Sequence, residues 1–142
     1  MPVFLLALIA IFQSSAPPAG DALIHVDIDG LRSEKGKVLC AIFASADGFP
    51  KDASKAPGVA RSSISGSHAA CEFSGLRPGK YAVSMFHDEN SNGKLDTNFI
   101  GIPREGVGAS NNPKARLGPP KFQDASFAFP GGKMDLKVTI QY

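Results

Sequence analysis

Oxygen-bearing side chains alternate along one short segment of the chain, residues 88–96, which reads Asp-Glu-Asn-Ser-Asn-Gly-Lys-Leu-Asp. Calcium takes about 6–8 oxygen ligands, and the calcium loop of helix-loop-helix proteins supplies them from alternate positions around a glycine at its sharp turn. Counted from the first aspartate, the glycine falls on Gly93. The ligand positions fall on Asp88, Asn90, Asn92, Lys94 (through its carbonyl) and Asp96. This spacing predicts a calcium site.

The match with that loop ends after Asp96. The last ligand position falls on Phe99, which cannot replace a bidentate glutamate. A calcium ion would therefore need a ligand from outside the segment, and the candidates are Glu105, Asp124 or water. Few charged ligands and a flexible site predict weak binding, about 10⁻⁴–10⁻³ M. The alternative is a metal-free turn, because Asn and Asp side chains also hydrogen-bond their own backbone.

Groups suited to catalysis are sparse. A Ser/His/Asp triad can be assembled from Ser110, His87 and Asp88, but no Gly-x-Ser-x-Gly elbow surrounds any serine. An envelope hydrolase with a cleft near His87, Asp88 and Glu105 is nevertheless an alternative to a non-enzymatic protein. A structural hydrogen bond is the simpler interpretation of His87.

Strands are the elements that must position the 88–96 segment, because apolar and polar residues alternate with a period of two along much of the chain. Residues 37–44 are apolar on both faces, which predicts a central, buried strand. Pro130, Gly131 and Gly132 predict the turn of a hairpin between the last two strands. No helix is predicted. The expected strands cover residues 22–28, 37–44, 59–65, 69–73, 81–88, 126–129 and 134–142. About seven short strands predict an all-β, Greek-key β-sandwich.

One long segment, residues 97–123, has no periodicity and carries Gly, Pro and Asn throughout. Loops longer than about 12–15 residues inside compact domains are usually functional or disordered. Apolar side chains predict that this loop packs onto the domain: Phe99, Ile100, Ile102, Val107, Leu117 and Phe122. Because the loop begins where the ion-type segment ends, we expect calcium to order it and its surface to serve in recognition.

The N-terminus carries an apolar run that is too short to span a bilayer and is followed by small residues. This pattern predicts a signal peptide at residues 1–19 and a single domain at 20–142. The alternatives are a buried strand or an uncleaved anchor. The remaining chain has no second apolar run of membrane length. The net charge of +2 predicts no strong attraction to nucleic acid or to an anionic membrane.

The chain has two cysteines, Cys40 and Cys71, each in the middle of an expected strand. In an oxidising compartment an even pair predicts a disulfide, which requires the two strands to be near neighbours. The alternative is two buried thiols that behave as small apolar side chains.

The motifs resemble a bacterial family called domain of unknown function 2141 (DUF2141). The similarity rests on residues 76–83, 87–96, 101–112 and 118–122, and it extends over roughly residues 22–142. It implies a small exported protein, periplasmic or extracellular in a Gram-negative bacterium, with a transthyretin-like (prealbumin-like) sandwich. The family has no established activity, so the implied partner is an unknown protein, glycan or envelope component. Val107 stands where members often carry an aromatic residue, so a ligand contact by that aromatic is not expected here.

Overall fold

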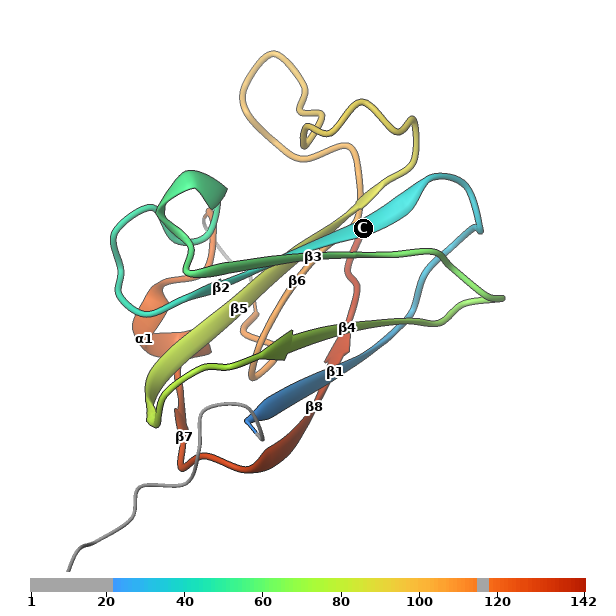
Figure 1. Cartoon of the computed structure of the whole chain (residues 1–142). Helices are drawn as coiled ribbons and strands as arrows, with labels where there is room; N and C mark the ends of the chain where they lie inside the picture. Colours follow the sequence, from blue (N-terminus) through green and yellow to red (C-terminus); the bar gives the residue numbers. More distant parts are fainter. Residues whose placement is uncertain (1–21, 115–117) are drawn as a thin grey trace, which may run out of the picture.

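The structure is a computed structural model that describes residues 22–114 and 118–142. Within these residues eight strands form two facing sheets, so the expected all-β sandwich is confirmed (Figure 1). The predicted signal peptide and Leu117 lie outside the described residues. None of the described helices is long and apolar enough to cross a membrane.

The first sheet has three strands in the order β4-β1-β8. In its centre, β1 (Leu23–Asp29) pairs antiparallel with β4 (Ala69–Ser74) and parallel with β8 (Lys133–Thr139). The period-two pattern of β1 places its isoleucines and its valine in the interior, where all three side chains are buried: Ile24, Val26 and Ile28.

The second sheet is built around β2 (Lys37–Phe43) and β5 (Gly79–Asp88). The strand β2 lies between β5 and the edge strand β3 (Gly58–Ser62), which confirms its predicted central position. On its other side, β5 pairs near its end with β6 (Val107–Ala109) and near its start with β7 (Phe127–Phe129).

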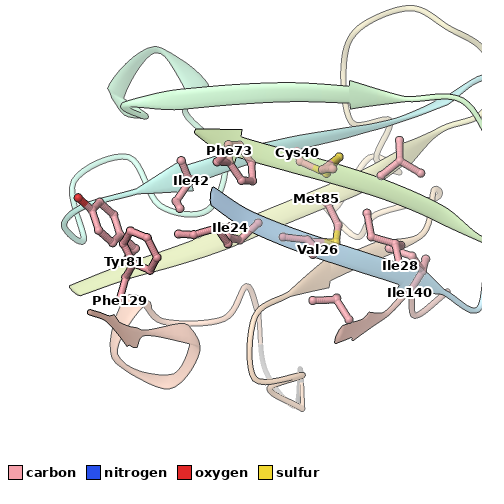
Figure 2. Packing of buried hydrophobic residues seen from close by; sticks show 14 of the residues in the cluster. Ile24, Val26, Ile28, Cys40, Ile42, Phe73, Tyr81, Met85, Phe129 and Ile140 are labelled. Atoms are coloured by element: carbon pink, nitrogen blue, oxygen red, sulfur yellow. A yellow bond between two sulfur atoms is a disulfide. The ribbon is translucent and has the colours of Figure 1, made fainter. Parts of the chain in front are cut away.

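The core lies between the sheets and is closed by a disulfide. Figure 2 shows Ile24, Val26 and Ile28 of the first sheet facing side chains of the second. The predicted disulfide joins Cys40 of β2 to Cys71 of β4, whose Cα atoms are 6.7 Å apart. The two strands belong to different sheets, so the bond links the two layers across the core.

The predicted hairpin at the C-terminal end is wrong. Pro130 and the two glycines after it carry the chain from one sheet to the other, because β7 pairs with β5 and β8 pairs with β1. Alternation in the sequence specifies which face of a strand is buried, and it does not specify the partner strand.

Two further differences concern the 97–123 segment. It contains β6, which has three residues between small neighbours and so offers no alternation to detect. It also ends in α1 (Phe122–Ala125), a single helical turn that is too short for helical periodicity. Another single turn, the 3₁₀ helix η2 (Ala53–Lys55), follows β2.

The expected packing of the long loop is only partly realised. The side chain of Phe122 packs edge-on against Phe49, with ring centroids 5.9 Å apart. In contrast, Phe99, Ile100 and Ile102 are exposed by 96%, 64% and 54%. The expectation that these three pack onto the domain is therefore wrong, because the segment that carries them projects away from the sandwich (Figure 1).

One side chain pairs with part of the edge of β8 that faces away from β1. Asn112 accepts the backbone N–H of Thr139 on Oδ1 at 2.9 Å and donates from Nδ2 to the carbonyl of Lys137 at 3.4 Å. Asn111 and Asn112 both have positive φ, 67° and 47°, a conformation that Asn tolerates better than most residues. Asn112 therefore imitates a short neighbouring strand.

Candidate functional site

The 88–96 loop begins at the end of β5 and is wound around the carboxylate of Asp88, which is buried. Oδ1 of Asp88 accepts the backbone N–H of Asn92 at 3.2 Å, and Oδ2 accepts that of Gly93 at 2.8 Å. Ser91 and Gly93 have left-handed φ angles of 56° and 75°, which let the chain reverse within a few residues. Asp88 therefore shapes the loop from inside.

Three of the predicted calcium ligands lie together on the outer side of this loop. Nδ2 of Asn90 donates to Oδ2 of Asp96 at 2.6 Å, and Nδ2 of Asn92 donates to Oδ1 of Asp96 at 2.9 Å. Oδ1 of Asn92 accepts the N–H of Lys94 at 2.9 Å. The side-chain N–H groups of Asn90 and Asn92 thus converge on the carboxylate of Asp96.

Glu105 is the outside carboxylate that reaches the loop. Its side chain is buried; Oε2 accepts the N–H of Glu89 at 2.7 Å, and Oε1 accepts the N–H of Asp96 at 2.9 Å. One carboxylate therefore joins the two ends of the loop. The other outside candidate, Asp124, lies in α1 and lines a different surface pocket, with Lys121 and Pro113, so it takes no part in this network.

As the side chains stand, Asn90 and Asn92 turn N–H groups toward Asp96, so a calcium ion would require their amides to rotate. Among the described residues no three His, Cys, Asp or Glu side chains are grouped as a metal site requires, so the carboxylates of Asp88, Asp96 and Glu105 do not share one centre. A half-turn of the Asn90 and Asn92 amides would bring two oxygens toward Asp96, and it would break the hydrogen bonds that these oxygens accept from the backbone N–H groups of Asn92 and Lys94. The donor set is then one carboxylate with amide and carbonyl oxygens, which predicts low affinity.

The residues after the loop form a small two-armed projection, residues 96–104, which we call the finger. Its arms are joined by backbone bonds from Asn98 N–H to the Ile102 carbonyl and from Arg104 N–H to the Asp96 carbonyl, both 2.8 Å long. A bridge between Thr97 and Pro103 lies between them. The yellow-to-orange segment in Figure 1 extends beyond both sheets.

The apex of the finger is a β-turn held by the side chain of Asn98. The N–H of Gly101 donates to the Asn98 carbonyl at 3.0 Å, which places Phe99 and Ile100 at the two corners of the turn. Oδ1 of Asn98 accepts the N–H groups of Ile100 and Ile102 at 3.0 and 2.9 Å. The conformation of the apolar apex is therefore fixed by hydrogen bonds to Asn98.

A polar cleft of about 470 Å³ lies between the base of the finger and the turn after β1. Arg32 pairs with Glu89 at its rim and lies over the ring of Tyr142, 4.4 Å from the ring centroid. The guanidinium of Arg32 holds the pKa of the Glu89 carboxyl below its ordinary value. The lining residues are Arg32, Glu89, Asn90, Asp96, Thr97, Arg104 and Glu105.

The candidate triad of Ser110, His87 and Asp88 is not formed, because each of these side chains has other hydrogen-bond partners. His87 is fully buried; its Nε2 lies 2.6 Å from the Lys35 carbonyl and its Nδ1 lies 2.7 Å from the Tyr142 hydroxyl. Because a carbonyl only accepts, Nε2 carries a proton and donates it to Lys35, while Nδ1 shares its hydrogen bond with the Tyr142 hydroxyl. Ser110 is also buried; its Oγ donates to the Ala125 carbonyl and accepts the N–H of Val83. Of His87, Asp88 and Glu105, only Glu105 lines the cleft.

The sequence interpretation missed two residues of this site, Asn98 and Arg32. Asn98 had a detectable signal, since Asn at the first position and Gly at the fourth are typical of a type I turn, and the finger reads Asn-Phe-Ile-Gly. Arg32 had none, because its partners Glu89 and Tyr142 are far along the chain.

The glycine-rich segment after Glu105 has a packing role. A Cβ added to Gly106 would lie 2.4 Å from Cγ2 of Ile140 and 2.5 Å from Cε1 of Tyr142. A Cβ on Gly108 would lie 2.9 Å from Cγ1 of Val138. Glycine is therefore required for β6 to lie close to the end of β8.

Comparison with known proteins places these motifs in a family. No curated protein and no solved structure matches the chain significantly. A family model described as an uncharacterised protein conserved in bacteria (DUF2141) matches residues 26–137, a range that includes the 88–96 loop, the finger and Glu105. Since that range is most of the chain, the protein belongs to the DUF2141 family.

Proposed function

We propose that this protein is an exported, non-enzymatic recognition module that presents the finger to a partner and binds calcium in the 88–96 loop. The observation that carries the proposal is the exposure of Phe99, Ile100 and Ile102 on a turn fixed by Asn98. Turn corners favour Gly, Pro, Asn, Asp and Ser, so two large apolar residues there have no local structural reason. Contiguous exposed apolar side chains mark interaction sites.

The proposed role of calcium is to fix the base of the finger. Asp96 is both the residue on which the Asn90 and Asn92 side chains converge and the residue at which the finger begins. An ion held by these three side chains, with the Lys94 carbonyl and water, would replace two amide–carboxylate bonds. Glu105 would hold the Asp96 backbone from the other side. The disulfide supports export, since such bonds persist in oxidising compartments.

Calcium titration followed by NMR and thermal unfolding tests this proposal. We expect the side-chain amide signals of Asn90 and Asn92 and the backbone amide signals of the finger to shift, with a Kd of about 10⁻⁴–10⁻³ M. A tenfold excess of calcium over Kd should stabilise the protein by about 1.4 kcal/mol. Asp96→Asn should weaken binding at least about tenfold. Asp135→Asn, which removes the same charge from an exposed position on β8, is the matched control.

Two results would contradict the calcium proposal. One is the absence of amide signal shifts at calcium concentrations of about ten times the expected Kd. The other is that Asp96→Asn shows shifts equal to those of the wild-type protein. The absence of shifts favours the metal-free alternative, in which hydrogen bonds maintain the loop without an ion. Equal shifts in Asp96→Asn would mean that calcium binds without Asp96. The envelope hydrolase has less support than either, because His87 and Ser110 are buried and have hydrogen-bond partners of their own.

A further inference from the structure

We propose that the partner of the finger is the surface of a phospholipid bilayer, into which Phe99, Ile100 and Ile102 insert while Arg104 and Lys94 contact headgroup phosphates. This inference rests on the proposed role of the finger in recognition and names its partner. Three features support it: the shape of the apex, its internal hydrogen bonds and its charges.

The shape of the apex favours a bilayer. The three apolar residues are exposed within four positions of one another, on a segment that extends beyond both sheets (Figure 1). A protein partner would have to provide a matching cavity for this segment. A bilayer surface needs no matching shape, and an aromatic ring with aliphatic neighbours suits its interfacial region.

The hydrogen bonds of the apex favour a bilayer more specifically. Lipid cannot satisfy backbone N–H groups, so a segment that enters it must pair them internally. Of the four N–H groups of residues 99–102, three donate to Asn98: those of Ile100 and Ile102 to its side chain and that of Gly101 to its carbonyl. A groove on a protein would not require this arrangement, because its own polar groups could satisfy the turn.

The charges around the tip complement phosphate. Lys94 precedes the finger and Arg104 ends it; both are exposed, and neither forms an ion pair with another described residue. Cationic side chains beside an inserted apolar group bind anionic headgroups at short range. The small net charge of +2 means that attraction is local, so insertion contributes most of the binding.

The acidic groups near the finger are engaged in hydrogen bonds within the loop and at the base of the finger. Asp88 and Glu105 are buried, and their oxygens accept backbone N–H groups. Glu89 pairs with Arg32, and Asp96 accepts the amides of Asn90 and Asn92. Hydrogen bonds from neutral N–H groups leave the carboxylate charges in place, so Lys94 and Arg104 can attract phosphate only locally, and the apolar side chains contribute most of the binding.

Tryptophan fluorescence gives a direct test, because the chain contains no Trp. In Phe99→Trp, vesicles of phosphatidylcholine and phosphatidylglycerol in equal parts should shift the emission to the blue, and brominated lipid should quench it. Val59→Trp is the matched control, because Val59 is 66% exposed on β3, outside the finger. Its emission should not change.

Vesicle flotation gives the second readout. The triple variant Phe99→Ser, Ile100→Ser, Ile102→Ser should reduce vesicle binding at least about tenfold, since these side chains provide the apolar area. Its thermal unfolding should not change, because the three side chains are exposed. Arg104→Gln should reduce binding about fivefold on vesicles with phosphatidylglycerol and have little effect on pure phosphatidylcholine.

The outcomes separate this inference from the proposed function when both assays are run with millimolar calcium and with chelator. Calcium shifts without vesicle binding would overturn the bilayer as partner and leave the calcium loop intact. Vesicle binding without calcium shifts would overturn the calcium loop and leave the bilayer. Equal vesicle binding by the triple variant, or capture of a protein through the finger with no vesicle binding, would also overturn the inference.

Discussion

At the scale of single residues, Glu105 holds the two ends of the 88–96 loop together. Its buried carboxylate accepts N–H groups from Glu89 and from Asp96, which are the two ends of the loop. A carboxylate can accept two such bonds at once, whereas a glutamine amide can accept on one side only and presents N–H donors on the other.

Glu105→Gln should therefore lower the free energy of unfolding by about 1–3 kcal/mol, because one N–H loses its acceptor and faces another donor. Urea unfolding measures this change. Asp135→Asn removes one negative charge from an exposed site and should change stability by less than about 0.5 kcal/mol. Equal stability of the two variants would contradict the role assigned to Glu105.

The sequence predicted which residues form the loop, but it did not predict how their side chains are oriented. The spacing of Asp88, Asn90, Asn92 and Asp96 indicated a loop built on oxygen atoms, and Glu105 was among the candidates for a contact from outside it. The spacing could not indicate that the Asn90 and Asn92 amides would face Asp96 with their N–H groups. An amide offers both a donor and an acceptor, and the sequence does not choose between them.

At the scale of elements, the finger depends on Asn98. Its Oδ1 is the acceptor for two backbone N–H groups of the apex. Asn98→Ala removes this acceptor, so hydrogen exchange at the Ile100 and Ile102 amides should accelerate by about tenfold through local opening. Global stability should change by less than about 0.5 kcal/mol, because the finger is exposed.

Asn98→Asp is the control for this prediction, since it keeps an acceptor oxygen at the same position and should keep the protection of both amides. Acceleration in Asn98→Asp as large as in Asn98→Ala would show that the side chain does not hold the apex. NMR-detected exchange at the two amides provides the measurement.

The long strands were predictable from alternation, and the short elements were not. β1 and β8 have seven residues each, enough for three inward positions, whereas β6 has three residues and α1 has four. The pairing of β8 with β1 was also beyond the pattern. β8 pairs with β1 because β7 is already paired with β5, and this arrangement is a property of the whole sandwich.

At the scale of the whole molecule, the Cys40–Cys71 disulfide links the two sheets and encloses a sequence separation of 31 residues. Closing a loop of this length in the unfolded chain is expected to stabilise the fold by about 3–4 kcal/mol. The double variant Cys40→Ala, Cys71→Ala should lose about that amount in urea unfolding.

Wild-type protein in reductant is the control for the double variant, since it lacks the bond and keeps both sulfur atoms in the core. The two should unfold at similar urea concentrations, both below that of the oxidised protein. A loss of less than about 1 kcal/mol in both would contradict a stabilising role. The disulfide was predictable from an even cysteine count. That it joins the two sheets was not, because this depends on which strands pair with β2 and with β4.

The contact of Asn112 with the edge of β8 has a consequence for behaviour at high concentration. An open edge strand is a template on which a second copy of the chain can add its own strand, and this growth leads to aggregates. Asn112 occupies the N–H of Thr139 and the carbonyl of Lys137, the groups that such an added strand would use. One amide side chain therefore limits edge-to-edge self-assembly, and replacing it with alanine would make the folded protein more prone to polymerise.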